Sequence, residues 1–489
     1  MTLVQLRKSG PLVEPLNKDF KNANDPPRAL RTLSHIIDND LCHRCGSCVG
    51  ICPTNVLGVD EEEYPVVKNL DACTDCDLCV KVCPGDEFDA FSIAKQMFGE
   101  FPDPKDMHGH FESAYLGYAT DEGVRRRSTS GGLVTGLLLS LLKRKIIDGA
   151  VVIGSHKTEL WKGVPIVART EEAIREATKA KYAISPTNIA FKEIREVEGN
   201  YAIVGLPCQI HGFHNAARLD RRLKDRVKVT IGLFCHAAIE HEPMRQIWAD
   251  TGEHGQRASK YISRYGKHSG TPHLQFSDGT VRPVYFPEAK GFRPSSMEII
   301  NVLYRLYTPP RCLTCYDSTA EFADIAVGDP WMPSPSEDID FYQGYTFAFA
   351  RTKNGKQVLS EADNAGDIHL VGITREIAKT ANVLMGHEKR NRAFRLIETR
   401  RRQGYAVPFY NFKIPKASGK EFILTEINML SHIFCFVKPG RRLMMKLLFS
   451  PFGYFLLRLN NVRRKLRDWR RDKAAKTKRT AVSHSSGTD

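Results

Sequence analysis

Hydrophobic and polar residues follow two alternating patterns in the middle of the chain, between residues 113 and 405. Residues 132–145, GLVTGLLLSLLKRK, have the apolar spacing of a helix with a buried face. Short apolar runs of the β type come after it, and three of them read GAVVIG, YAIVGLP and VKVTIGLFC. This succession of helices and short buried strands predicts an α/β core with a sheet that is at least partly parallel.

The sequence around this core divides into segments of different composition. The first residues are polar and interrupted by prolines, which predicts a leader that packs late or stays mobile. A cysteine-rich domain follows, and a stretch of Pro, Gly, His and Asp after it is typical of a linker. Behind the core come a mixed connecting segment and a basic, helical tail whose last ten residues are typical of disorder. The expected boundaries are a leader at 1–33, the cysteine-rich domain at 34–95, the linker at 96–112, the core at 113–405, the connecting segment at 406–430 and the tail at 431–489.

Length and composition limit the class of protein. A chain of 489 residues is long enough for roughly three domains of ordinary size. Hydrophobic residues make up 42% and charged residues 26%, which is typical of a globular protein and excludes a wholly disordered chain. The mean hydropathy of −0.34, with no apolar run of about 18–20 residues, argues against a multi-span membrane protein.

The net charge of +15 is concentrated near the end of the chain. Between Lys438 and Thr480 there are 15 basic and 2 acidic residues, which leaves a net charge of +2 for the rest. A nucleic-acid-binding function would therefore depend on the tail alone, and the tail contains no nucleic-acid-binding motif. We expect no nucleic-acid partner.

Eight cysteines repeat one spacing twice. Each copy has the form C-x2-C-x2-C-x3-C-P, and the copies end at Pro53 and Pro84. This spacing is typical of two-cluster ferredoxins, in which three cysteines of one copy hold a [4Fe–4S] cluster and the fourth reaches the other cluster. Zinc ribbons are the alternative, but they place C-x2-C pairs on either side of a longer loop. The pattern predicts one cluster on Cys42, Cys45, Cys48 and Cys83 and a second on Cys73, Cys76, Cys79 and Cys52.

The cysteines also bear on the cellular compartment. There are 13 of them, and their close spacing is not that of a disulfide framework. The first twenty residues contain neither an apolar signal segment nor a small-residue cleavage site. We therefore expect a reducing compartment and a cytoplasmic protein.

Four further cysteines lie within the α/β region. Cys208 follows the apolar run YAIV, Cys235 ends the run VTIGLFC, and Cys312 and Cys315 form a separate C-x2-C pair. Two thiols at strand ends and a loop pair can converge on a third [4Fe–4S] cluster or on zinc. The alternative is that Cys208 and Cys235 are inert core residues. Cys435 stands alone in an apolar stretch of the tail, and we expect it to be structural.

A phosphate-binding loop is another candidate site in the core. The segment 128–132, STSGG, precedes the helix predicted over 132–145, and three arginines stand before it. Hydroxyls and glycines at a helix start leave N–H groups free for a phosphate, although a plain helix cap is the alternative. No G-x-G-x-x-G follows a strand, so a nicotinamide-binding module is not supported. Clusters pass single electrons whereas most organic substrates take two, so a flavin would suit this chain.

Six short motifs follow one another between residues 125 and 331. They are R-x-x-S-x-S-G-G, K-Y, G-x-P-C-Q, L-F-C, C-x2-C-x-D and A-D-I-x-x-G-D-x-W, at residues 125–132, 181–182, 205–209, 233–235, 312–317 and 323–331. Their order resembles the coenzyme F420 hydrogenase/dehydrogenase beta-subunit family over roughly residues 113–400. The ferredoxin repeat is a common extension in that family, whereas the tail matches no general pattern of it.

The resemblance implies an FAD-binding α/β core with a [4Fe–4S] cluster beside the flavin. It favours the cluster interpretation for the four cysteines of the core. The residues that it implies at the flavin are Ser128, Ser130, Gly131, Gly132, Lys181 and Tyr182. No catalytic proton donor is assigned. The histidines near the proposed cluster, which we expect to be structural, are His211, His214 and His236.

These features predict an iron–sulfur flavoprotein oxidoreductase. Electrons would pass between the [4Fe–4S] clusters, which face a ferredoxin or a larger oxidoreductase complex, and FAD. The resemblance implies two-electron exchange between FAD and coenzyme F420 or another conjugated organic substrate. The alternative is a non-catalytic electron-transfer subunit that docks on a membrane or a partner complex through its tail.

Large apolar residues alternate with Lys and Arg over residues 441–471 of the tail. Lys446, Ser450 and Pro451 interrupt the apolar part, so a membrane-spanning helix is not expected. Two short amphipathic helices hinged at Pro451 would lie on an anionic membrane surface, which would make the protein peripheral on the inner face of the cytoplasmic membrane. The aromatic anchors would be Phe449, Phe452, Tyr454, Phe455 and Trp469. The alternative is a helix pair that docks on the body of the protein or on a partner subunit.

Overall fold

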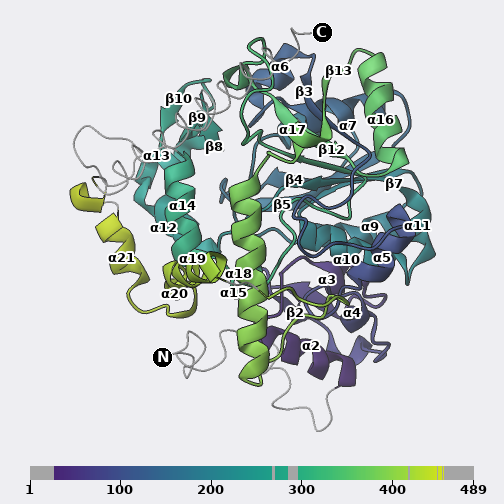
Figure 1. Cartoon of the computed structure of the whole chain (residues 1–489), viewed down its shortest axis with the longest axis vertical. Helices are drawn as coiled ribbons and strands as arrows, with labels where there is room; N and C mark the ends of the chain where they lie inside the picture. Colours follow the sequence, from purple (N-terminus) through teal and green to yellow (C-terminus); the bar gives the residue numbers. More distant parts are fainter. Residues whose placement is uncertain are drawn as a thin grey trace, which may run out of the picture.

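An eight-stranded mixed sheet forms the centre of the computed structural model (Figure 1). Its strand order is β13-β3-β12-β11-β7-β6-β4-β5. The four strands β11, β7, β6 and β4 are parallel to one another, and the strands on either side of them pair antiparallel. The bounds are β3 Ser113–Ala119, β4 Gly149–Ser155, β5 Gly163–Ala168, β6 Tyr201–Gly205, β7 Val227–Leu233, β11 Ile325–Gly328, β12 Thr346–Ala350 and β13 Ile368–Ile373. The predicted α/β core with a partly parallel sheet is confirmed.

The structure describes residues 27–266, 270–284, 296–416, 419–448, 450–453 and 455. The predicted leader at 1–33 therefore lies outside the described residues as far as residue 26. Its last part is already helical, because α2 (Arg28–Asp38) begins there. Residues 456–489 of the predicted tail also lie outside the described residues.

Helices cover both faces of the sheet because its central strands are buried on both sides. Every residue of β6 is buried, as expected for a parallel strand between two helical layers. On one face α7 (Leu133–Lys143) and α16 (Lys353–Asn364) pack against alternate side chains of the strands. On the other face lie α9 (Phe191–Glu196), α10 (Pro207–Ala217) and the N-terminal domain. The remaining helices of the core are α6 Glu122–Arg127, α8 Glu171–Glu176, η2 Thr187–Ala190, α11 Arg221–Arg226, α15 Pro310–Leu313, η3 Phe341–Gln343, α17 Arg375–Ala378 and α18 Val383–Arg402.

A second, three-stranded sheet of order β10-β9-β8 is inserted after β7. Its apolar side packs with three helices into a separate hydrophobic cluster around Ile247, Leu274 and Leu303. The bounds are α12 His241–Asp250, α13 Gly252–Arg257, β8 Ala258–Tyr265, β9 Thr271–Phe276, β10 Val281–Pro283 and α14 Ser296–Tyr307.

The N-terminal domain, drawn in purple in Figure 1, lies below the large sheet. It consists of short helices around a two-stranded hairpin. Its elements are α2, α3 Ser47–Ile51, β1 Leu57–Val59, β2 Pro65–Val67, η1 Leu70–Ala72, α4 Leu78–Lys81 and α5 Ala90–Phe98. Because α5 ends at Phe98, the first three residues of the predicted linker at 96–112 are helical.

Two glycines bring the N-terminal domain into close contact with the core. A Cβ on Gly50 would stand 2.1 Å from the carbonyl oxygen of Asn188, and a Cβ on Gly212 would stand 2.2 Å from the hydroxyl of Ser47. The side chain of Asn188 donates to that hydroxyl at 2.8 Å, and its backbone N–H donates to the carbonyl of Cys45 at 2.9 Å. The two domains are therefore in backbone-to-backbone contact at this point.

The C-terminal helices α19 (Gly419–Ser431), α20 (Ile433–Phe436) and α21 (Arg441–Leu448) pack against the body of the protein. Arg441 is 1% exposed, donates to the carboxylate of Glu240 at 2.8 Å and lies over the ring of Tyr307. Of the two alternatives for the tail, docking on the body is the one that this part of the chain shows. Of the proposed aromatic anchors, Phe449, Tyr454 and Trp469 lie outside the described residues. No helix within the described ranges combines the length and the apolar character needed to cross a bilayer.

The contact at Gly50 predicts the effect of a single methyl group. In Gly50→Ala the new Cβ meets a backbone oxygen that cannot move alone, so the domains must separate slightly. We expect a loss of about 1–3 kcal/mol in the free energy of unfolding, measured as a lower midpoint of thermal denaturation.

Gly372→Ala is the matched control, since nothing lies within 4 Å of a Cβ at that position. It should leave the midpoint unchanged. Equal midpoints for the two variants would contradict the close contact between the domains.

Candidate functional site

The structure gathers the eight cysteines of the N-terminal domain into two groups of four. The thiol of Cys48 has a pKa raised above its ordinary value, by burial first and then by the charges of Cys42, Cys83 and Cys45. Burial likewise raises the pKa of Cys79 to about 12, with the charges of Cys52, Cys76 and Cys73 adding to the effect. Each thiol therefore senses the three partners that the repeat predicts, including the fourth cysteine of the other copy.

Left-handed backbone at equivalent positions bends both cysteine loops. Arg44 and Gly46 have φ values of 56° and 86° in the first copy, and Asp75 and Asp77 have values of 50° and 61° in the second. Two left-handed residues between the first and third cysteines wrap the loop around a point. The short helices α3 and α4 then carry the third cysteine of each copy.

The second group of cysteines reaches the surface, whereas the first group is more deeply placed. Cys76 is exposed and lines a surface cavity together with Cys52, Cys73 and Cys79. In the first group Cys45, Cys48 and Cys83 are buried, and only Cys42 is partly exposed.

The four cysteines of the core line one cavity, although they come from three separate segments. Cys208 lies at the start of α10 after β6, and Cys235 follows β7, so both stand at the C-terminal ends of neighbouring parallel strands. Cys312 belongs to α15, and Cys315 comes directly after it. The alternative, in which Cys208 and Cys235 are inert core residues, gives no reason for the two thiols to line the same cavity as Cys312 and Cys315.

The core cavity adjoins the first group of cysteines. After burial, the charge that raises the pKa of Cys208 most is that of Cys45, ahead of Cys315, Cys312 and Cys235. His43, from the first cysteine loop, lines the core cavity itself. The three groups therefore lie in the order second group, first group, core.

All three groups have the donor set of [4Fe–4S] clusters. Each offers four thiols, and a cube takes one thiolate on each of its four irons. Within the described ranges, no three His, Cys, Asp or Glu side chains stand close enough together to hold a single metal ion. Cys435 belongs to none of the groups; it is buried, and its thiol contacts the carbonyls of Tyr304 and Arg305.

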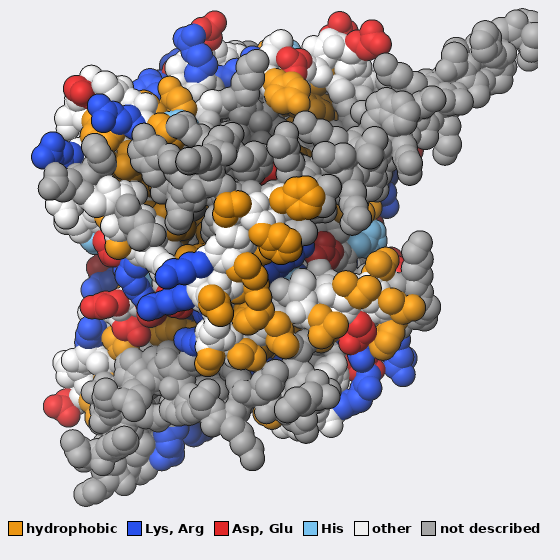
Figure 2. Space-filling view, turned by 90° about the vertical axis from the view of Figure 1, so that its left-hand side faces the viewer, with side chains coloured by type: hydrophobic (Ala, Val, Ile, Leu, Met, Phe, Trp, Pro, Cys, Tyr) orange, Lys and Arg blue, Asp and Glu red, His pale blue; other side chains and the backbone are white. Residues whose placement is uncertain are grey.

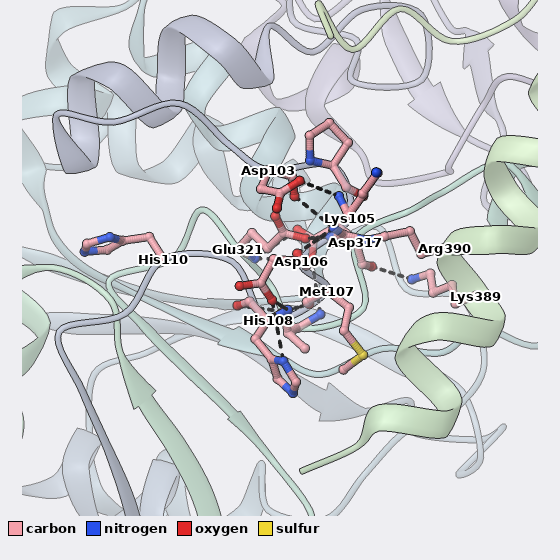
Figure 3. A network of polar contacts seen from close by, with 12 residues as sticks. Asp103, Lys105, Asp106, Met107, His108, His110, Asp317, Glu321, Lys389 and Arg390 are labelled. Carbon is pink, nitrogen blue, oxygen red and sulfur yellow. Dashed lines mark hydrogen bonds and ion pairs between the residues drawn. The ribbon is translucent and has the colours of Figure 1, made fainter. Parts of the chain in front are cut away.

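A network of buried charges stands beside the core cavity (Figure 3). Lys389 of α18 lines the cavity, and its ammonium donates to the carbonyls of Cys235 at 2.8 Å and Asp317 at 2.5 Å. The next residue, Arg390, forms an ion pair with Glu321 and donates to three carbonyls of the segment 103–106. Sequence reasoning missed Lys389, because α18 carries many basic residues and no local pattern distinguishes this one.

The six residues implied at a flavin fall into two neighbouring sets. Lys179 connects them, because its ammonium donates to the carbonyl of Ser128 at 3.0 Å. Ser130 donates to one carboxylate oxygen of Asp329, and Arg264 donates to the other at 2.7 Å. The motifs at 125–132, 181–182 and 323–331 thus meet in space, and Arg264 is a member that the sequence did not indicate.

The second of these sets lines a cavity. Lys181 and Tyr182 line an apolar cavity between α12, α14 and the small sheet, together with Lys179, Trp161 and Lys260. The loop residues Ser128, Ser130, Gly131 and Gly132 do not line this cavity. The hydroxyls of Ser128 and Ser130 and the N–H of Gly131 are engaged within the protein, and Gly132 is the left-handed residue that begins α7.

The three lysines of this cavity are desolvated. Burial, with the charge of Lys260 adding to its effect, lowers the pKa of Lys181 to about 7 and that of Lys179 to about 8. Lys181 donates to the carbonyls of Ala177 and Thr178. An anion in the cavity would relieve the repulsion among these ammonium groups.

The two cavities share a wall. Ala237 and Ala238 line the cysteine cavity, and the next residue, Ile239, lines the lysine cavity. Tyr304 lies near both cavities: burial raises the pKa of its phenol above the ordinary value, and the charges of Cys235 and Tyr182 add to the effect.

Two of the three histidines near the core cavity are structural, as expected. His211 stacks on Phe88 and its Nε2 is hydrogen-bonded to the carboxylate of Asp317 at 3.1 Å, and His214 bonds to the carbonyl of Phe322 at 2.7 Å. For His236 the expectation is wrong in part. Its Nδ1 is buried and has no hydrogen-bond partner among the described residues.

Comparison with known families gives three matches along the chain. The "4Fe-4S dicluster domain" matches residues 34–84. The "Coenzyme F420 hydrogenase/dehydrogenase, beta subunit" family matches with its N-terminal part at residues 114–192 and its C-terminal part at residues 198–376. These two parts together cover more than half of the chain.

Similar proteins carry names linked to coenzyme F420. The coenzyme F420-dependent sulfite reductase of Methanocaldococcus jannaschii is 28% identical over 77% of this chain, which spans 53% of that relative. The coenzyme F420 hydrogenase subunit beta of Methanothermobacter thermautotrophicus is 25% identical over 62% of this chain and 99% of its own length.

A chain of the F420-reducing [NiFe] hydrogenase complex of Methanosarcina barkeri is also similar, with 24% identity, a TM-score of 0.49 and coverage of 64% of this chain and 99% of that one. From the matches at residues 114–192 and 198–376, the chain belongs to the coenzyme F420 hydrogenase/dehydrogenase beta-subunit family, with a 4Fe–4S dicluster domain ahead of the family core.

Proposed function

We propose that this protein is an iron–sulfur flavoprotein oxidoreductase with three [4Fe–4S] clusters and one FAD. The observation that carries the proposal is the cavity lined by Cys208, Cys235, Cys312 and Cys315, which adjoins Cys45 on one side and the lysine cavity on the other. Four thiols gathered from distant segments around one space are typical of a cluster site rather than of an inert core.

The cysteines would hold the clusters as the two spacings predict. Two clusters would lie on the two groups of the N-terminal domain, and the third on the core group. The exposed position of Cys76 would make the second group the point of contact with a ferredoxin or a larger redox complex. The burial of Cys45, Cys48 and Cys83 in the first group would keep that part of the electron path away from solvent.

The residues that line the lysine cavity support its assignment to FAD. Its walls are mainly apolar, with Trp161, Tyr182 and Tyr261 among them, and three ammonium groups stand near one another to meet a pyrophosphate. The indole N–H of Trp161 is buried there without a partner among the described residues. A bound flavin would convert between one-electron and two-electron transfer.

The chemical class of the substrate follows from the family. The relatives named above act with coenzyme F420, which supports F420 or another conjugated organic molecule as the two-electron partner. This substrate would meet the flavin on the side of the cavity away from the shared wall, where the small sheet and α14 form the boundary.

Removal of one core thiol tests the third cluster. The wild-type protein, purified without oxygen, should contain about twelve irons, four for each cube. We expect Cys208→Ser to lose about a third of the iron while both ferredoxin clusters remain, because only the core cavity loses a ligand. Iron analysis and EPR spectra of the reduced protein would measure this.

Cys435→Ser is the matched control, since Cys435 is a buried cysteine that lines no cluster cavity. It should keep all the iron. A wild-type protein that holds zinc in the core cavity, or a Cys208→Ser variant with unchanged iron, would refute the third cluster.

Anaerobic mixing tests the flavin. Reduced ferredoxin should bleach the flavin absorbance of the wild-type protein, and in a separate mixture reduced F420 should do the same.

We expect Lys181→Met to bind FAD about tenfold more weakly, because it removes a charged partner of the pyrophosphate. Since the pKa of Lys181 in the flavin-free protein is about 7 and a bound anion raises it, wild-type affinity should fall as the pH rises above 7, and this part of the pH dependence should disappear in the variant.

Lys356→Met changes an exposed lysine of α16 and should leave FAD binding as it is. A protein with all its clusters but no flavin, whether purified or reconstituted, would contradict the proposal. That result would favour the non-catalytic electron-transfer subunit instead.

A further inference from the structure

Helix α19 turns a row of large aliphatic side chains to solvent. Its buried side is formed by Thr425 and Met429, which are 5% and 7% exposed. The residues on the opposite side stand at helical spacing and are each more than half exposed. They are Ile423 at 60%, Leu424 at 56%, Ile427 at 60% and Leu430 at 61%.

Helix α21 adds exposed leucines and basic residues to the same end of the chain. Leu443 is 73% and Leu447 47% exposed, and they alternate along the helix with Arg442 and Lys446, which are also exposed. Figure 2 shows hydrophobic side chains in a band near the middle of this face of the molecule, with Lys and Arg side chains beside them. We call the exposed residues of α19 and α21 the outward face.

We propose that the outward face docks on the surface of an anionic lipid bilayer. Aliphatic side chains would enter the boundary between headgroups and acyl chains, and Arg442 and Lys446 would meet lipid phosphates. Glu421 of α19 is exposed as well and Arg442 pairs with Glu242, so the basic residues of the adjoining chain add to the attraction. Residues 456–489, which follow directly, contain 11 basic and 3 acidic residues, so the charge of the adjoining chain suits the same surface.

The charge pattern favours a lipid surface over a second copy of the chain. Two copies that met through this face would bring their basic residues together, which costs binding free energy. Lysine is also depleted at the centres of protein interfaces, whereas it is frequent on helices that lie in a membrane interface. The docking mode differs from a hinged helix pair, because α19 and α21 stay packed on the body.

Vesicle flotation of the full chain tests the proposal. We expect binding to vesicles of phosphatidylcholine with phosphatidylglycerol, much less to phosphatidylcholine alone, and a decrease at high salt. The double variant Ile427→Glu with Leu430→Glu should lower the affinity for these vesicles by roughly tenfold or more. It replaces two aliphatic side chains that would enter the bilayer with charges that anionic lipids repel. Iron and flavin contents should stay at wild-type values, which separates this test from that of the proposed function.

Leu219→Glu is the matched control, because it changes an exposed leucine far along the chain from α19. Equal flotation of the double variant and this control would overturn the proposal, as would wild-type protein that binds no vesicle. The face would be assigned to a second copy of the chain if the wild type bound no vesicles and formed a dimer, and if the double variant were a monomer.

A second inference concerns the charge beside the core cavity and rests on the proposed core cluster. Lys389 is 1% exposed and reaches the cavity from α18, and Figure 3 shows it beside Asp317. Its two hydrogen bonds to the carbonyls of Cys235 and Asp317 fix the ammonium in place.

We infer that Lys389 is a positioning residue that raises the reduction potential of the core cluster. A fixed positive charge in a medium of low dielectric constant stabilises the cluster state with the extra electron. The step itself is the transfer of one electron from the first group to the core, and no bond forms or breaks. The cluster would thereby become the acceptor of electrons from the N-terminal domain.

The test is a potentiometric titration followed by EPR. Lys389→Gln keeps a hydrogen-bond donor but removes the charge, so the potential of the core cluster should shift to lower values. The two ferredoxin clusters should shift less. Lys389→Arg keeps the charge and should retain a potential close to that of the wild type.

Lys356→Gln controls for the loss of an exposed lysine and should shift nothing. An unchanged core potential in Lys389→Gln, or equal shifts in the Gln and Arg variants, would overturn the inference. Loss of the core iron in Lys389→Gln would also overturn it, because the role would then be structural. A wild-type protein without a core cluster would instead be a failure of the proposed function.

Discussion

One buried guanidinium connects the N-terminal domain to the sulfur-lined centre of the core. Arg311 is 1% exposed, and it donates to the carbonyls of Leu41, Pro84 and Gly85 in the cysteine-rich domain. It also donates to Thr314 and Tyr410 on the side of the core. A buried charge of this kind is tolerated only when its hydrogen bonds are complete, so the two domains hold each other in register. The residue that follows it along the chain is Cys312, and the position of the core thiols therefore depends on the same contact.

The cysteine groups impose a second constraint, because they bury many ionisable thiols in a small volume. Burial and mutual repulsion raise the pKa of Cys48, Cys79 and Cys208, so the free thiols would stay neutral and the metal-bound thiolates need the charge of iron. Lys389 and Arg311 supply additional positive charge around the core. Folding of this region and assembly of its clusters are therefore expected to be linked.

Local sequence was sufficient to predict the parts of the site that are held together by short spacing. The repeated cysteine motif predicts both groups of the N-terminal domain, since three of the four thiols in each come from seven consecutive residues. The apolar runs predict the buried strands β4, β6 and β7. Lys389 and Arg264 could not be found in this way, because each reaches its partners from a distant element and its neighbours in sequence are also basic or polar.

The segments at the domain borders show the same limit of local reasoning. The stretch at 96–112 has the composition of a linker, yet its backbone carbonyls receive hydrogen bonds from Arg351 and Arg390 of the core. The tail has the pattern of a free amphipathic pair, yet Arg441 fastens it to Glu240. In both places a buried arginine that bonds to a distant segment decides the packing, and sequence periodicity contains no information on that partner.

The shared wall between the two core cavities determines where substrate recognition must occur. Residues 237–239 separate the thiols from the lysine cavity by a single stretch of backbone, so in the proposed function the substrate would approach a flavin in that cavity from the opposite side. The opposite boundary consists of Tyr261 on β8, Pro272 on β9 and Leu303 on α14. These elements belong to the inserted small-sheet region and not to the large sheet that carries the cysteines. Substrate choice can therefore change through the insertion while the electron path stays fixed.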